Sequence, residues 1–209
     1  MSEMSKMDRL VETGAVAIVR AQDQQSGQQI ADSIVDAGLM CIEVTLTSPG
    51  ALEIIASLAS RSGVCVGVGT LLDPTDVSRA RSAGATFVVS PNVNPEVIAA
   101  TKREGLISIP GVASPTEVAI ALAAGADILK LFPASTYGPE HLQALRGPFP
   151  GNLWCPTGGI SVALIPDWFA AGATMVGLGG PLLKGGIGAI AANVSTYMKA
   201  IAAAKEIRI

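Results

Sequence analysis

Short apolar runs alternate along the chain with longer, helix-like segments in which polar residues recur. Each run is continuously apolar, so both of its faces are expected to be buried. Continuous apolar strands separated by helices predict a parallel sheet that is covered by helices. There are eight such runs: AVAIVR, MCIEVTL, VCVGVGT, TFVVSP, LISIP, ILKLF, LWCPT and MVGLG.

Glycine stands where the helix-like segments end and the next apolar run begins, as in DAGLM, SAGAT and AAGAD. Glycine readily adopts the left-handed conformation that ends a helix, so each of these positions predicts a helix C-terminus. Successive glycines lie 20 to 26 residues apart, which fits one short strand and one helix. The set is Gly38, Gly63, Gly84, Gly105, Gly125, Gly151 and Gly172; the PFPGN context makes Gly151 its weakest member.

Eight strand–helix units predict one domain, residues 1–209, with the (β/α)8 TIM-barrel fold. The segment before the first strand, about residues 2–13, is expected to be an extra helix that closes the bottom of the barrel. A doubly wound open sheet is the alternative, but that fold normally uses fewer strands. The repeat length also suits a leucine-rich solenoid, although no leucine pattern recurs in this sequence.

Composition narrows the classes of function. Hydrophobic residues make up 49% of the chain and charged residues 15%, which indicates a globular domain with a large core. The net charge of −3 argues against nucleic-acid binding. No apolar run reaches the roughly 18 residues of a membrane span, so no membrane partner is expected. The polar N-terminus, MSEMSKMDRL, lacks the apolar region of a signal peptide, and we expect a cytoplasmic protein.

The cysteines and the histidine argue against a metal site. Cys41, Cys65 and Cys155 lie far apart in apolar runs, without the spacing of metal ligands. We interpret them as small core residues in a reducing compartment. His141 is the single histidine, which excludes a cluster of histidine ligands within one chain.

Polar residues and glycines gather at the carboxyl ends of the predicted strands, where TIM barrels build their active sites. Because these ends meet on one face of a barrel, the residues are expected to surround a common pocket. In strand order they are Arg20; Glu43, Thr45 and Thr47; Gly69 and Thr70; Ser90, Pro91 and Asn92; Pro110; Lys130; Pro156, Thr157, Gly158 and Gly159; and Gly177, Gly179 and Gly180.

Lys130 and Glu43 are the only lysine and the only acid inside an apolar strand. One interpretation is a buried ion pair that holds the barrel together. Such pairs are weak stabilisers, and unpaired buried charges are costly, so we favour a catalytic role for both residues. A lysine in a water-poor pocket gives up its proton more readily, and its neutral amine can then attack a carbonyl.

Two glycine clusters, PTGGIS and GLGGP, follow the seventh and eighth strands. They could be tight strand-to-helix turns and nothing more. Backbone N–H groups exposed after these two strands also form the usual phosphate site of a TIM barrel. Since both clusters fall on those two strands, the sequence predicts a phosphate site.

The combined motifs resemble the 2-keto-3-deoxy-6-phosphogluconate (KDPG) aldolase family, also known as 4-hydroxy-2-oxoglutarate aldolases. The resemblance runs nearly end to end, through VAIVR, IEVTLTSPGA, GVGTLLDP, FVVSPN, IPGVASPTE, LKLFPAS, GPFP, PTGGIS and GLGG. It implies a class I, Schiff-base aldolase that cleaves 2-dehydro-3-deoxy-6-phosphogluconate to pyruvate and glyceraldehyde 3-phosphate. It also implies cleavage of 4-hydroxy-2-oxoglutarate to pyruvate and glyoxylate.

The resemblance assigns roles to residues that match the family's motifs. Lys130 is assigned as the Schiff-base lysine and Glu43 as the general acid/base. Members of the family are typically cytoplasmic homotrimers that need no metal or other cofactor and serve the Entner–Doudoroff route. The residues assigned to substrate binding are Arg20, Thr70, Pro91, Phe132, Thr157, Gly158, Gly159, Gly179 and Gly180.

Two positions depart from the family pattern. Many members carry arginine at the position of Thr47, where it contacts the substrate carboxylate; others end the first strand in arginine, as Arg20 does here. Arg20 is therefore the candidate for the missing charge. The eighth strand is often followed by serine at the position of Gly180, so one hydroxyl contact to phosphate is absent.

Three rival functions remain open. The nearest is a paralogue that acts on the galactonate epimer, since LTSPG and YGPE also occur in that branch; Thr157 favours the gluconate epimer. A phosphate-binding barrel isomerase would use Glu43 as base and Lys130 as electrophile without forming an imine. A non-catalytic trimeric scaffold would neither trap nor release pyruvate.

Overall fold

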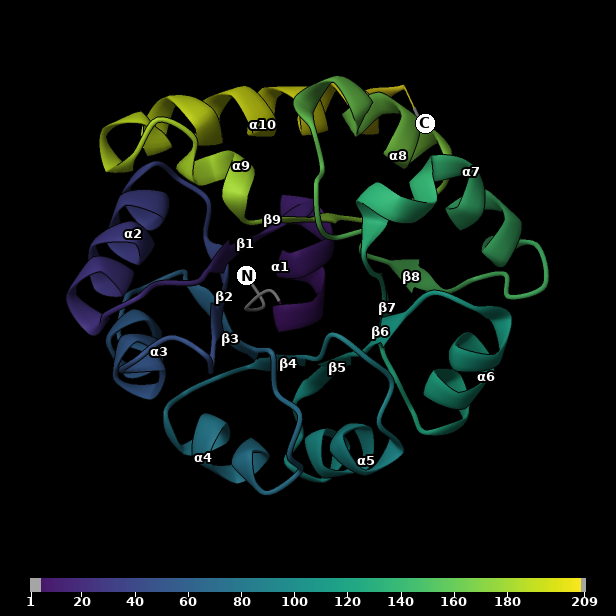
Figure 1. The fold of residues 1–209 in the computed structure, drawn as a ribbon, viewed down its shortest axis with the longest axis horizontal. Helices are drawn as coiled ribbons and strands as arrows, with labels where there is room; N and C mark the ends of the chain where they lie inside the picture. Colours follow the sequence, from purple (N-terminus) through teal and green to yellow (C-terminus); the bar gives the residue numbers. More distant parts are fainter. Residues whose placement is uncertain (1–4, 208–209) are drawn as a thin grey trace.

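The computed structural model describes residues 5–207, in which strands and helices alternate along the chain (Figure 1). The strands are β1 (Ala15–Val19), β2 (Cys41–Thr45), β3 (Cys65–Gly69), β4 (Phe87–Val89), β5 (Ile107–Ile109), β6 (Gly111–Val112), β7 (Ile128–Leu131), β8 (Leu153–Trp154) and β9 (Val176–Leu178). The α-helices are α1 (Lys6–Thr13), α2 (Gln24–Asp36), α3 (Ala51–Ala59), α4 (Asp76–Ser82), α5 (Pro95–Arg103), α6 (Pro115–Ala123), α7 (Ala134–Arg146), α8 (Ile165–Ala170), α9 (Gly180–Leu183) and α10 (Ile190–Glu206). Two 3-10 turns, η1 (Val162–Leu164) and η2 (Ile187–Ala189), precede α8 and α10.

The strands form a curled parallel sheet, and helices α2 to α8 and α10 lie around its outer face (Figure 1). Six strands pair in the order β5-β4-β3-β2-β1-β9, and three more pair in the order β6-β7-β8. A parallel bridge between Thr157 and Gly177 connects the segment after β8 to β9. The predicted parallel sheet covered by helices is thus confirmed.

The run LISIP was predicted to be one strand that ends in Pro110, and the structure adds a further short strand directly after that proline. β5 pairs with β4 and ends at Ile109, and β6 begins at Gly111 and pairs with β7. Pro110, between them, has no N–H to donate, but its carbonyl accepts a hydrogen bond from the Lys130 N–H at 2.9 Å. The interruption therefore lies directly beside the strand that carries Lys130.

The glycines predicted to end the helices all have positive φ, between 69° and 103°. Six of them follow a helix directly or within a few residues, whereas Gly151 lies in the turn after α7, as its PFPGN context suggested. At the opposite ends, four helices within residues 5–207 begin with a side-chain cap, namely α1, α2, α5 and α6. Ser114 and Glu117 form a reciprocal capping box at the start of α6, which fixes where that helix begins.

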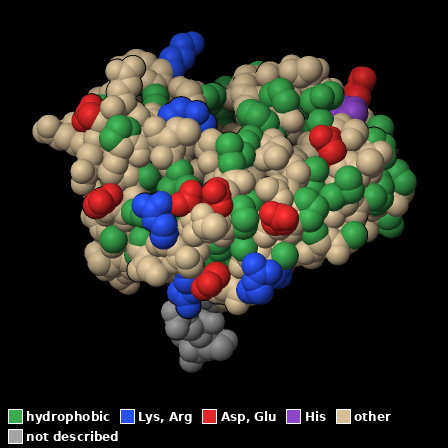
Figure 2. All heavy atoms as spheres, turned by 60° about the horizontal axis from the view of Figure 1, so that its bottom comes forward, with side chains coloured by type: hydrophobic (Ala, Val, Ile, Leu, Met, Phe, Trp, Pro, Cys, Tyr) green, Lys and Arg blue, Asp and Glu red, His purple; other side chains and the backbone are tan. Residues whose placement is uncertain are grey.

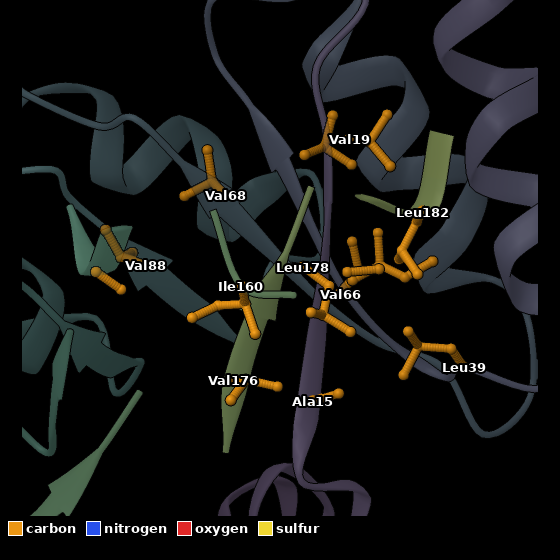
Figure 3. Close-up of a cluster of buried hydrophobic side chains, with 14 of the residues drawn as sticks. Ala15, Val19, Leu39, Val66, Val68, Val88, Ile160, Val176, Leu178 and Leu182 are labelled. Carbon is orange, nitrogen blue, oxygen red and sulfur yellow. The ribbon is translucent and has the colours of Figure 1, made fainter. Parts of the chain in front are cut away.

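Both faces of the sheet are buried, which explains the continuous apolar runs. One set of side chains packs between the sheet and the surrounding helices (Figure 3); it includes Ala15, Val66, Val176 and Leu178. The alternate residues of the same strands point to the inside of the curl. This inner cluster is formed by Leu10, Val16, Cys41, Cys65, Phe87, Val89, Ile109, Ile128, Cys155 and Met175.

Helix α1 contributes Leu10 to the inner cluster, and that side chain is fully buried. The helix begins after Ser5, whose hydroxyl accepts a hydrogen bond from the Asp8 N–H at 3.1 Å. The Cys41 thiol, at the start of β2, donates to the Thr13 hydroxyl of α1 at 3.3 Å, so α1 covers the amino ends of the strands, opposite the predicted pocket. The predicted helix over residues 2–13 is confirmed from Lys6 to Thr13, and residues 2–4 lie outside the described residues.

Charged side chains are interspersed in sign on the face drawn in Figure 2. Those with ion partners lie outside the core, as in the Arg61–Asp36 pair at 2.6 Å and the Lys102–Asp127 pair at 2.6 Å. Within residues 5–207, only Glu43 and Lys130 are charged side chains that are buried. The two buried charges are therefore the same two residues for which the sequence predicted a catalytic role.

Cys41, Cys65 and Cys155 are buried free thiols, as predicted. Within the described chain, one helix, Ile187–Glu206, is long and apolar enough by length and composition to cross a membrane. Helices that cover the core of a folded domain meet the same criterion, and α10 buries Ile190, Val194 and Ile201 against the rest of the fold. The match is weak evidence for a span.

Candidate active site

The two-residue alternation of the strands decides which side chains face the site. On β2, Glu43 follows Cys41 by two residues and therefore points to the same inner side. On β7, Lys130 follows the inward-facing Ile128 in the same way. On β1, Ile18 is followed by Arg20, which extends beyond the end of the strand. Three separate strands thus place charged groups over one interior space.

That space is a cavity of about 350 Å³ at the carboxyl ends of the strands. It brings together all eleven residues that the sequence predicted for the site. Ile18 and Pro181 also line it and were not predicted; the alternation with Arg20 could have indicated Ile18. The full lining is Ile18, Arg20, Glu43, Thr70, Pro91, Lys130, Phe132, Thr157, Gly158, Gly159, Gly179, Gly180 and Pro181.

Glu43 and Lys130 are 3% and 6% exposed and share the cavity without forming an ion pair. Within the described part of the chain, no carboxylate oxygen lies within 4.0 Å of the Lys130 Nζ. The Nζ instead lies 4.9 Å from the centroid of the Phe132 ring, a favourable position for a cation. The interpretation of the two residues as a direct structural ion pair is therefore wrong.

Burial raises the pKa of the Glu43 carboxyl above its ordinary value, because the charged form loses contact with water. The positive charges of Lys130 and Arg20 act in the opposite direction and lower that pKa. A carboxyl with a raised pKa holds a proton more readily near neutral pH than an exposed glutamate does. Such a group suits proton transfer in both directions.

Glycine makes room for Glu43 on the neighbouring strand. A Cβ atom added at Gly69 would overlap with the Glu43 side chain, including its carboxylate. The absence of a side chain at Gly69 therefore leaves the space that the Glu43 carboxylate occupies. Gly177 serves Thr157 in the same manner, because a Cβ there would overlap with the Thr157 side chain.

Arg20 and Thr70 contact each other at one end of the cavity. The Arg20 Nη2 donates a hydrogen bond to the Thr70 Oγ1 at 3.2 Å. Thr70 is the one non-glycine residue between positions 5 and 207 with a positive φ, at 54°. This conformation is unfavourable for a β-branched residue, and such strain is concentrated at functional sites. The pair presents a cation and a hydroxyl to the cavity.

Glycine turns form another part of the lining. Gly158 and Gly159 have φ values of 96° and 74°, and Gly180 begins the short helix α9. The carbonyl of Gly158 accepts a hydrogen bond from the Ser135 N–H at 2.9 Å, which ties this turn to the start of α7. A turn anchored in this way can present its backbone to a ligand. The predicted phosphate contacts remain a prediction.

The sequence resembles those of known proteins over most of its length. Residues 7–199 match the family model described as "Aldolase: KDPG and KHG aldolase". A probable 2-dehydro-3-deoxy-6-phosphogalactonate aldolase of Rhizobium meliloti is 36% identical over 190 residues, covering 88% of this chain and 90% of that protein. A 2-dehydro-3-deoxy-phosphogluconate aldolase of Pseudomonas aeruginosa is 38% identical over 143 residues, covering 68% and 65%.

Solved structures resemble the fold closely. A structure described as native KDPGal has a TM-score of 0.86 at 30% identity and covers 92% of this chain and 96% of its own. The KDPG aldolase of Legionella pneumophila, with pyruvate captured as a covalent carbinolamine, has a TM-score of 0.80 at 26% identity and covers 96% and 98%.

The curled parallel sheet, with a buried lysine and glutamate in a cavity at one end, identifies an α/β enzyme that acts on a small molecule. The chain belongs to the KDPG and KHG aldolase family. The residues between positions 5 and 207 include no group of three His, Cys, Asp or Glu side chains that could hold a metal ion.

Replacing Gly69 with alanine is expected to displace the Glu43 carboxylate, because the added methyl group overlaps with it. The kcat of Gly69→Ala should fall by roughly 10²-fold, approaching the loss in Glu43→Gln, the usual scale for removing a general base. Steady-state kinetics measures this, with Gly188→Ala as control, since a Cβ at Gly188 meets no atom within 4 Å. A folded Gly69→Ala protein with unchanged kcat would contradict the account.

Proposed function

We propose that this protein is a class I aldolase that cleaves a phosphorylated 2-keto-3-deoxy six-carbon sugar acid to pyruvate and glyceraldehyde 3-phosphate. The observation that carries the proposal is the buried Lys130 amine, which faces the same cavity as Glu43 without being paired to it. The covalent pyruvate adduct named for the Legionella relative supports an imine at this lysine. Cleavage of 4-hydroxy-2-oxoglutarate to pyruvate and glyoxylate is included as a second activity.

The reaction begins when the neutral Lys130 amine attacks the C2 ketone of the substrate. Loss of water gives an iminium ion, whose positive charge accepts the electrons of the breaking C3–C4 bond. Glu43 removes the proton from the C4 hydroxyl, directly or through one water, and glyceraldehyde 3-phosphate leaves. The remaining enamine takes a proton at C3, and hydrolysis of the resulting imine releases pyruvate and the free lysine.

The two ends of the substrate are assigned to different groups in the cavity. Arg20 and Thr70 bind the C1 carboxylate, since a guanidinium offers two parallel hydrogen bonds to a carboxylate. The glycine turns at Gly158, Gly159 and Gly180 bind the phosphate through their backbone N–H groups. Their lack of side chains supports this assignment, because a phosphate needs close approach to the backbone.

The gluconate epimer is the proposed substrate, with the galactonate epimer as the alternative; relatives of both kinds share more than a third of aligned residues. Thr157 supports the gluconate assignment. Its Oγ1 already donates to the Cys155 carbonyl at 3.1 Å, so it is left to accept a hydrogen bond from a substrate hydroxyl. An isomerase or a non-catalytic scaffold would lack the covalent imine.

The proposal extends to the architecture and the assembly. The curled sheet is taken as a complete (β/α)8 barrel with α1 as its extra N-terminal helix, β5 and β6 counting as one strand. The hydrogen bond from the Lys130 N–H to Pro110 and the bridge at Thr157 support closure. The protein is a homotrimer in the cytoplasm, and its three free, buried cysteines suit a reducing compartment.

The imine is tested by reduction with borohydride in the presence of pyruvate. We expect the mass of one reduced pyruvyl group on the peptide that contains Lys130. Lys130→Met should abolish both labelling and turnover while circular dichroism shows that the fold persists, and Lys102→Met serves as control on an exposed lysine. Labelling of another lysine, or turnover without labelling, would overturn the proposed mechanism and favour the isomerase class.

The end of the substrate that Arg20 contacts is tested with ligands of different length. If Arg20 binds the C1 carboxylate, Arg20→Ala should raise KM for pyruvate exchange, 4-hydroxy-2-oxoglutarate and the phosphorylated acid by roughly 10- to 100-fold, the scale of a charged hydrogen bond. Losses confined to the phosphorylated acid would instead assign Arg20 to the phosphate. Unchanged kinetics on all three would show that Arg20 contacts neither end.

The epimer preference is tested with both phosphorylated acids. We expect kcat/KM to be higher for the gluconate epimer, and Thr157→Val to reduce that preference by about tenfold, the value of one hydrogen bond. Thr174→Val serves as control, since its hydroxyl accepts from the Trp154 N–H and does not line the cavity. A higher kcat/KM for the galactonate epimer would establish the alternative.

A further inference from the structure

A chain of hydroxyl groups begins at Thr45, the last residue of β2, and continues through Thr47 and Ser48 in the turn before α3. The Thr47 Oγ1 donates to the Thr45 Oγ1 at 3.1 Å, and the Thr45 and Ser48 hydroxyls share a hydrogen bond at 3.1 Å. Thr45 is fully buried and Ser48 is 3% exposed. A buried hydroxyl is normally hydrogen-bonded, because leaving it without a partner costs free energy.

One partner of Ser48 is the backbone next to Arg20. The Ser48 Oγ accepts a hydrogen bond from the Ala21 N–H at 3.1 Å, across 27 positions of sequence. Arg20 is therefore fixed at two points. Its backbone neighbour is held by Ser48, and its guanidinium is held by Thr70 at 3.2 Å. The anchors Ser48 and Thr70 follow the neighbouring strands β2 and β3, whose own pairing is continuous up to Thr45 and Gly69.

We propose that Ser48 is a positioning residue that sets the Arg20 guanidinium for the substrate carboxylate. The inference rests on the proposed role of Arg20. An arginine side chain has high rotational freedom, and its hydrogen bonds are strongest when the backbone that carries it is fixed. Thr47 does not line the cavity. Its hydroxyl instead donates to Thr45, which in turn shares a hydrogen bond with Ser48. Ser48 itself contacts no substrate, since it is also absent from the lining.

The test is a double-mutant cycle between Ser48 and Arg20, read as KM for pyruvate exchange and for the phosphorylated acid. Ser48→Ala removes the acceptor of the Ala21 N–H and should raise KM about tenfold, with kcat changed much less. In an Arg20→Ala background, Ser48→Ala should raise KM no further, because the group that it positions is already absent. Thermal unfolding of each variant verifies the fold.

Thr101→Ala provides the matched control. Like Ser48, Thr101 has a buried hydroxyl that is hydrogen-bonded to the backbone, but it lies in α5 and donates to the Val97 carbonyl at 2.8 Å. Its removal should leave KM unchanged, as expected for a purely structural hydroxyl. The comparison distinguishes the loss of any buried hydrogen bond from the loss of the bond between Ser48 and the backbone next to Arg20.

The outcomes are distinct. An equal rise of KM on adding Ser48→Ala to wild type and to Arg20→Ala would mean a merely structural role and would overturn the inference. An effect of Arg20→Ala without any effect of Ser48→Ala would overturn the inference alone and leave the proposed function standing. Unchanged KM in Arg20→Ala would overturn the role of Arg20 and the inference with it, while the borohydride result would still decide the aldolase mechanism.

Discussion

Two charged side chains are held inside a sheet whose other buried side chains are uncharged, and the site keeps these two apart within one cavity. Glu43 and Lys130 are both nearly inaccessible, but no ion pair joins them. A direct pair would satisfy both charges and leave neither free for a substrate. Instead, the Gly69 backbone gives space to the carboxylate, and the Phe132 ring lies beside the amine. The substrate carbonyl and hydroxyl would enter between groups that the protein has already desolvated.

The alternation of side chains along the strands allowed the two buried charges and the position of the cavity to be predicted from sequence. A charged residue within a continuously apolar run must point into the core or into a cavity, so Lys130 and Glu43 were identifiable without knowledge of the fold. The glycines that end helices gave the repeat of strand and helix, and their positive φ values agree. Strands of a parallel sheet align their carboxyl ends, so residues far apart in sequence could be expected around one cavity.

Other features depend on contacts that no local pattern encodes. The interruption at Pro110 depends on which neighbouring strand supplies a donor, here the Lys130 N–H. The strained backbone of Thr70 and the hydrogen bond from the Ala21 N–H to Ser48 depend on loops that meet only after the sheet has formed. Sequence patterns also suggested a direct pair between Glu43 and Lys130 as one interpretation, because they report burial but not distance.

A crystal structure of the protein frozen in the presence of pyruvate tests the central claim most directly. The account predicts continuous density between the Lys130 Nζ and C2 of pyruvate, with the pyruvate carboxylate within hydrogen-bond distance of Arg20 or Thr70 and Glu43 beside the adduct. Pyruvate bound without a covalent bond to Lys130, or attached to a lysine outside the cavity, would contradict it.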